Sequence, residues 1–176
     1  MIEQINRIYS GGGRQGASAE EIYNSAKTWE ESNNFSRAID GYLEITEHHS
    51  QDAQFLEEVW ERAYSLAMKY DKGWLNEVVN IIGSWLQNIG RFNVAAEIFE
   101  SIGDYENAVD SYIRCNMHDR ALEVAQLVTP PNVRDKMIKD IQNIIRNSQL
   151  GRGGQGAQEM IGKGDKGGLD QMFNQG

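Results

Sequence analysis

The sequence is poor in cysteine and in proline. Among its 176 residues there is one cysteine, Cys115, and the two prolines are adjacent, Pro130 and Pro131. A single cysteine cannot form an internal disulfide bond, which excludes a disulfide-stabilised scaffold and favours a reducing compartment. Because proline is the residue that most strongly interrupts helices, nothing outside this pair forbids helical structure.

Long apolar runs and basic charge are also lacking. The mean hydropathy is -0.58, and no segment approaches the ~20 apolar residues that a membrane helix needs. We therefore expect no membrane insertion. The 17 basic residues are outnumbered by 26 acidic ones, for a net charge of -9. This balance disfavours nucleic acid and anionic membranes as partners.

The acidic excess lies in residues 16–61, which hold eleven acidic and two basic side chains, whereas the rest of the chain holds fifteen of each. Such a region either keeps helix faces solvated or attracts a basic partner. For the second case we predict partner contacts at six glutamates: Glu30, Glu31, Glu44, Glu57, Glu58 and Glu61.

Apolar residues follow a helical period almost throughout the chain. The spacing predicts a short helix near residues 2–9, followed by a glycine-rich linker that ends at residue 17. Ser18 and Glu21 have the spacing of a capping box, which marks the start of the next helix. Further helices are expected over 52–70 and 74–89, and one more from Asn132 to Leu150.

A short sequence repeat recurs at Phe92, Tyr105 and His118, with a step of thirteen residues. An earlier copy of this repeat begins at Asn34-Phe35. Each copy has Gly or Asn before this position, which tolerates a left-handed turn, and a small Ala three residues after it, which lets a neighbouring helix approach closely. The residues expected to pack in this way are Phe35, Ala38, Tyr42, Phe92, Ala95, Phe99, Tyr105, Ala108, Tyr112 and Ala121. The pattern predicts an all-α fold of about eight helices over residues 18–150, an α-solenoid of tetratricopeptide-like antiparallel helix pairs.

Glycine is concentrated at the end of the sequence, with nine glycines in the last 26 residues. We predict a flexible glycine-rich loop over 151–168. The chain stops at Gly176, whereas Gly90 and Gly103 are each followed by a further repeat copy, so residues 169–176 are expected to begin a truncated next repeat. The chain is then expected to be a segment of a longer solenoid.

Two motifs match catalytic or binding patterns without the required context. Residues 151–156 match G-x-G-x-x-G, but a helix is expected before them and more glycine follows, whereas a dinucleotide site needs a strand and then a helix. Cys115 and His118 have the spacing of two metal ligands, but the sequence offers no second cysteine to complete such a site. We therefore expect no catalytic residue, cofactor, metal ion or small-molecule substrate, and no enzyme activity.

Two stretches resemble a known family. They are AKTWEESNNFSRAIDGYLEIT and VVNIIGSWLQNIGRFNVAAEIFESIGDYENAVDSYIRCNMHDRALEVAQ. Both resemble repeats of the large subunits of intraflagellar transport that combine WD and tetratricopeptide repeats, and in detail the solenoid of the intraflagellar transport protein 172 family. The resemblance covers about residues 18–150 and extends weakly over 168–176. The tetratricopeptide signature W-x-x-L-G-x-x-Y is absent.

The resemblance implies a non-catalytic scaffold in the intraflagellar transport B complex, needed for the assembly of transport trains and of cilia. It implies other intraflagellar transport subunits as partners. The implied location is the cytoplasm, the cilium or flagellum, and the basal body. The alternative is a related helical-repeat scaffold of another assembly, either the intraflagellar transport A complex or a vesicle coat.

The repeat interpretation can be tested at its small residues. Replacing Ala95 or Ala108 by Leu should lower the free energy of unfolding by about 1–3 kcal/mol each, because the added carbons overpack a close helix contact. Urea denaturation followed by circular dichroism measures the change. If both substitutions are neutral, the proposed packing of the repeat is wrong.

Overall fold

The computed structural model describes residues 16–159, which form eight helices and no strand. The all-α prediction is confirmed over these residues. The helices are α2 (Ala19–Glu31), α3 (Phe35–Glu44), α4 (Ala53–Tyr70), α5 (Leu75–Asn88), α6 (Phe92–Ser101), α7 (Tyr105–Arg114), α8 (His118–Ala125) and α9 (Pro131–Glu159). The predicted helix near residues 2–9 and the predicted repeat start at 169–176 lie outside the described residues.

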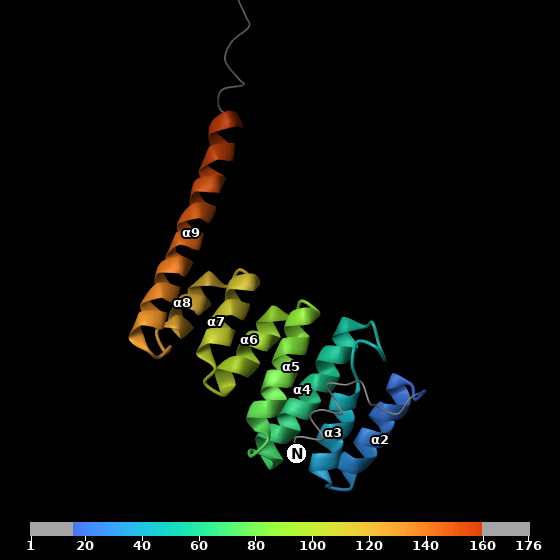
Figure 1. Ribbon diagram of the computed structural model, residues 1–176. Helices are drawn as coiled ribbons and strands as arrows, with labels where there is room; N and C mark the ends of the chain where they lie inside the picture. Colours follow the sequence, from blue (N-terminus) through green and yellow to red (C-terminus); the bar gives the residue numbers. More distant parts are fainter. Residues whose placement is uncertain (1–15, 160–176) are drawn as a thin grey trace, which may run out of the picture.

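The helices stack in the order of the sequence. Each one packs on the helix before it and the helix after it, in an antiparallel row that runs from α2 to α8 (Figure 1). The last helix, α9, packs on α8 at its beginning and extends away from the row (Figure 1). This arrangement is that of an α-solenoid, in which a helix contacts its neighbours along the chain.

Polar side chains fix where several helices begin. At α2 the backbone N–H of Glu21 donates to Oγ of Ser18 (3.2 Å), and the N–H of Ser18 donates to the Glu21 carboxylate (2.8 Å), so the predicted capping box is present. Asp52 and Asp104 cap α4 and α7 in the same position. These contacts satisfy backbone donors that the first turn of a helix otherwise leaves unpaired.

Left-handed residues end the helices that precede each repeat copy. The backbone angle φ is +57° at Asn33, +78° at Gly90, +79° at Gly103 and +61° at Asn116. In all four copies this residue lies two positions before the first residue of the next helix. In the first copy the left-handed residue is therefore Asn33 and not the adjacent Asn34 of the sequence pattern.

The repeat positions lie in one continuous apolar core. Tyr42, Phe99 and Tyr112 are buried, and Phe35 and Tyr105 are half-buried against the core. The four small residues of the repeat have no exposed surface: Ala38, Ala95, Ala108 and Ala121. At each of these positions a larger side chain would have to displace a neighbouring helix.

Two glycines allow especially close contact between helices. A Cβ atom added to Gly83 in α5 would lie 2.2 Å from Cζ of Phe99, so the ring of Phe99 in α6 lies directly on the backbone of α5. A Cβ atom added to Gly41 in α3 would lie 2.9 Å from Cβ of Ala26 in α2. Glycine weakens a helix interior by about 1 kcal/mol relative to alanine, and here the close packing offsets that cost.

The long helix α9 differs in two ways from the sequence expectation. It begins at Pro131, one residue before Asn132, because the first helical position needs no N–H donor. It also continues to Glu159, into the segment expected to be a loop from residue 151. Glycine lowers helix propensity but does not block the helical backbone as proline does, and no proline follows Pro131.

The contact between Phe99 and Gly83 gives a direct stability test. The substitution Gly83→Ala should lower the free energy of unfolding by about 1–3 kcal/mol, because the ring of Phe99 must move. The matched control is Gly73→Ala, where the nearest atom to the added Cβ is Oδ1 of Asp71 at 3.9 Å. Chemical denaturation of both variants checks this, and equal effects would contradict it.

Candidate interaction surface

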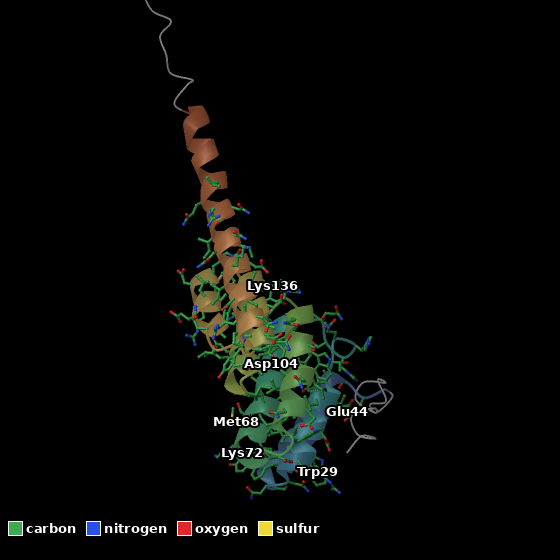
Figure 2. The ribbon with its side chains drawn as sticks, turned by 60° about the vertical axis from the view of Figure 1, so that its left-hand side comes forward. Trp29, Glu44, Met68, Lys72, Asp104 and Lys136 are labelled. Carbon is green, nitrogen blue, oxygen red and sulfur yellow. The ribbon has the colours of Figure 1, made fainter. Side chains whose placement is uncertain are left out.

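The six glutamates predicted as partner contacts do not form one patch. Glu30 and Glu31 lie in the last turn of α2, and Glu44 is the last residue of α3. Because these helices are antiparallel, their ends point in opposite directions, as the positions of Trp29 and Glu44 show (Figure 2). The remaining three, Glu57, Glu58 and Glu61, share the first half of α4.

Glu30 contacts side chains of the same chain on two other helices. The hydroxyl of Tyr42 in α3 donates to Oε2 of Glu30 (2.8 Å). The guanidinium of Arg62 in α4 donates to both oxygens, with Nε 3.0 Å from Oε2. Only 14% of the Glu30 side chain is exposed. The hydrogen bond from Arg62 is the main cause that lowers the pKa of Glu30. Burial is the main cause that raises the pKa of Tyr42.

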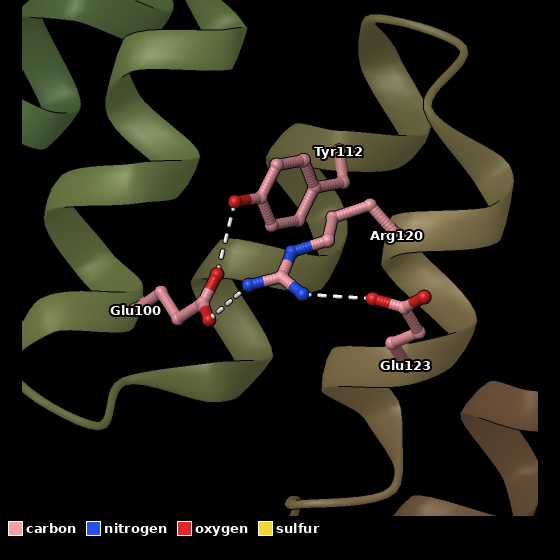
Figure 3. Close-up of polar contacts among 4 residues, drawn as sticks. All are labelled: Glu100, Tyr112, Arg120 and Glu123. Carbon is pink, nitrogen blue, oxygen red and sulfur yellow. Dashed lines mark hydrogen bonds and ion pairs between the residues drawn. The ribbon is translucent and has the colours of Figure 1, made fainter.

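A second cluster of the same kind ties α6, α7 and α8 together (Figure 3). The hydroxyl of Tyr112 donates to Oε2 of Glu100 (2.9 Å), and Nη2 of Arg120 donates to Oε1 of Glu100 (2.6 Å). The other terminal nitrogen of Arg120 donates to Oε2 of Glu123 (2.7 Å). Each carboxylate oxygen of Glu100 therefore has a donor from a different helix.

The two Glu-Tyr-Arg clusters are copies of one unit. In both, the tyrosine follows the glutamate by twelve residues and the arginine comes from the next helix. The glutamate also lies five residues before the first aromatic of its repeat, Phe35 in one case and Tyr105 in the other. The sequence analysis did not predict these clusters. Their signal in the sequence is the shared spacing of a Glu, an aromatic five residues later and a Tyr twelve residues later.

An acidic cluster lies on the surface of α4 and α6. It consists of Glu57, Glu58 and Glu61 on α4 and Glu97 on α6. Glu61 is exposed, but partial desolvation of its carboxyl group raises its pKa, and the negative charges of Glu57, Glu97 and Glu58 raise it further. Of the four, Glu57 has a cationic partner, with Oε2 2.8 Å from Nε of Arg91. Glu58, Glu61 and Glu97 are exposed.

The described residues offer no group of three or more His, Cys, Asp or Glu side chains arranged to hold a metal ion. Sγ of Cys115 lies 3.4 Å from the carbonyl oxygen of Tyr112, a contact within its own helix end. Within residues 16–159, no helix is both long and apolar enough to cross a membrane.

Comparison with known proteins gives consistent matches. Intraflagellar transport protein 172 of Chlamydomonas reinhardtii is 36% identical over 167 residues, which is 92% of this chain. The Homo sapiens homolog is 30% identical over 131 residues, or 74% of the chain, and the Mus musculus homolog 29% over 116 residues, or 65%.

The chain is homologous to intraflagellar transport protein 172. The resemblance seen in the sequence is thereby confirmed over most of the chain. The chain spans 9% of the Chlamydomonas protein and 6–7% of the two mammalian homologs. No family model and no solved structure matches it.

Glu30 and Glu61 should affect stability in opposite directions. A lowered carboxyl pKa stabilises the fold at neutral pH and loses this effect as pH falls, so Glu30→Gln should lower the melting temperature at pH 7. A raised pKa means that ionisation of Glu61 destabilises the fold, so Glu61→Gln should raise the melting temperature at pH 7.

The Glu61→Gln difference should vanish as pH falls below the ordinary carboxyl pKa, whereas the Glu30→Gln difference should persist to lower pH, until the lowered pKa of Glu30 is passed. Thermal melts across this pH range measure them, with Glu47→Gln, in an exposed turn, as the control. Differences of the same sign for Glu30→Gln and Glu61→Gln would contradict the charge arrangement described here.

Proposed function

We propose that this chain is a non-catalytic, protein-binding segment of an intraflagellar transport B complex subunit. The observation that supports this most directly is the 36% identity with intraflagellar transport protein 172 over 92% of the chain. The partners are other intraflagellar transport subunits, and the role is to hold such subunits together during train and cilium assembly. The chain then acts in the cytoplasm, at the basal body, and in the cilium or flagellum.

A solenoid recognises partners through exposed side chains of successive helices, because its core side chains are used between neighbouring helices. The acidic cluster of Glu57, Glu58, Glu61 and Glu97 has this character, since it extends over two helices of the stack. The carboxylates of this cluster repel one another, and a positive charge placed among them relieves the repulsion. This relief adds to the favourable free energy of binding a basic partner. We propose this cluster as the contact for a basic segment of a partner subunit.

The other predicted glutamates have different roles in this proposal. Glu30 contributes to the Glu-Tyr-Arg cluster and is largely covered by it. Glu31 and Glu44, at the ends of α2 and α3, remain predicted contacts outside the acidic cluster. Glu97, which lies outside the acidic region of the sequence, joins the proposed contact because α6 returns to the same surface as α4.

The test is capture of intraflagellar transport subunits from an extract of ciliated cells, with the chain as bait. The charge-reversed variant Glu58→Lys/Glu61→Lys/Glu97→Lys should lose this capture, because the basic partner then meets positive charge. Glu57 is left unchanged so that its ion pair with Arg91 is kept. Capture by the wild-type chain should weaken as salt is added, since salt screens exposed charges.

The matched control reverses three exposed acidic residues on other helices, Glu106→Lys/Asp119→Lys/Asp140→Lys, with the same total charge change. This variant should keep the capture, and circular dichroism should show equal helicity for both. Loss of capture in both variants would indicate an effect of net charge alone. Capture of A complex or coat subunits instead would contradict the proposed assembly.

A further inference from the structure

The first three helices are joined by directional contacts. Glu30 of α2, Tyr42 of α3 and Arg62 of α4 form the first Glu-Tyr-Arg cluster. The buried indole N–H of Trp60 in α4 donates to the carbonyl oxygen of Ile45, just after α3 (2.8 Å). The rings of Phe35 and Tyr70 stack with centroids 3.6 Å apart. We call α2–α4, residues 19–70, the N-terminal half.

The next four helices are joined in the same way. The second Glu-Tyr-Arg cluster connects α6, α7 and α8. Helix α5 joins them through the close contact of Gly83 with Phe99 of α6. It is also held by a hydrogen bond from Nε2 of Gln87 to Oγ of Ser111 in α7 (2.8 Å). We call α5–α8, residues 75–125, the C-terminal half.

The contact between α4 and α5 is of a different kind. Trp60 and Trp85 meet across it, with ring centroids 5.2 Å apart at 42°. One polar contact that joins the halves is the Glu57–Arg91 ion pair. Its two facing atoms are buried and 2.8 Å apart, without the alignment of a hydrogen bond.

These differences affect how the two interfaces resist motion. Hydrogen bonds have a preferred geometry, whereas apolar packing, which here includes the tilted Trp60–Trp85 pair, is less directional and allows packed helices to slide. Across the same boundary, the like charges of Glu61 on α4 and Glu97 on α6 repel each other. The ion pair of Glu57 with Arg91 opposes this repulsion.

We propose that the solenoid bends as two units, the N-terminal and C-terminal halves, at the α4–α5 contact, and that the Glu57–Arg91 ion pair limits this bending. The repulsion between Glu61 and Glu97 favours the more open arrangement. The bending is a property of the chain alone and does not depend on the partner proposed above.

The test measures distances between pairs of spin labels in the full chain with Cys115→Ser. Cysteines are placed at exposed positions of α2, α4, α5 and α8: Asn24, Ser65, Asn80 and Asp119. The pair Ser65–Asp119 crosses the α4–α5 contact, whereas Asn80–Asp119 and Asn24–Ser65 each lie within one half. We expect the crossing pair to have the broadest distance distribution.

Removing the ion pair by Arg91→Gln should broaden the crossing distribution further and leave the other two unchanged. The control Arg134→Gln removes an ion pair with the adjacent Asp135 in α9 and should change none of them. Glu57→Gln removes the same Glu57–Arg91 ion pair by changing the glutamate instead of the arginine. This second variant keeps the test valid if Arg91→Gln fails to fold. Combining Glu61→Gln with Glu97→Gln should narrow the crossing distribution.

Equal widths for the three wild-type pairs would overturn the proposal. It would also be overturned if Arg91→Gln broadened all three distributions alike, since the chain would then be uniformly flexible. An unchanged crossing distribution in both Arg91→Gln and Glu57→Gln would show that the ion pair does not limit bending.

Discussion

Short helices need neighbours, and the whole structure depends on this constraint. Helices α3, α6 and α7 have ten residues each and α8 has eight, whereas isolated helices below ~12–15 residues are marginal in water. Each is stabilised by burial against the helices before and after it. No single short helix is therefore an independent folding unit, and a side chain that spaces two helices wrongly also weakens the contacts on either side.

The sequence was sufficient for the regular part of this stack. The thirteen-residue step places a left-handed residue, an aromatic and a small residue at fixed positions, and each has a local physical role. That is why the helix order and the position of Ala95 or Ala108 between helices follow from spacing alone. The shift from Asn34 to Asn33 shows the limit of such patterns, because either asparagine tolerates the left-handed turn and the aromatic two residues on decides between them.

Contacts between residues far apart in the sequence were harder to predict from the sequence. Arg62 meets Glu30 across 32 residues, whereas Arg120 meets Glu100 across 20. The separation differs because α4 begins later after α3 than α8 does after α7, and because Arg62 lies deeper in its helix than Arg120 does. No single spacing therefore predicts the arginine. Glu97 joins Glu61 only through the fold of α5 between them. The extent of α9 was missed for another reason, because low helix propensity favours a loop without excluding a helix.

The distribution of acidic side chains relates stability to recognition. A net charge of -9 suggests many carboxylates available to a partner, yet Glu30, Glu57 and Glu100 each pair with an arginine outside their own helix. These carboxylates stabilise the stack, and their charge is compensated. The carboxylates that repel one another, Glu58, Glu61 and Glu97, are those for which a basic partner brings the largest relief. Uncompensated charge is thus the physical property that distinguishes the proposed contact surface from the acidic side chains that hold the helices together.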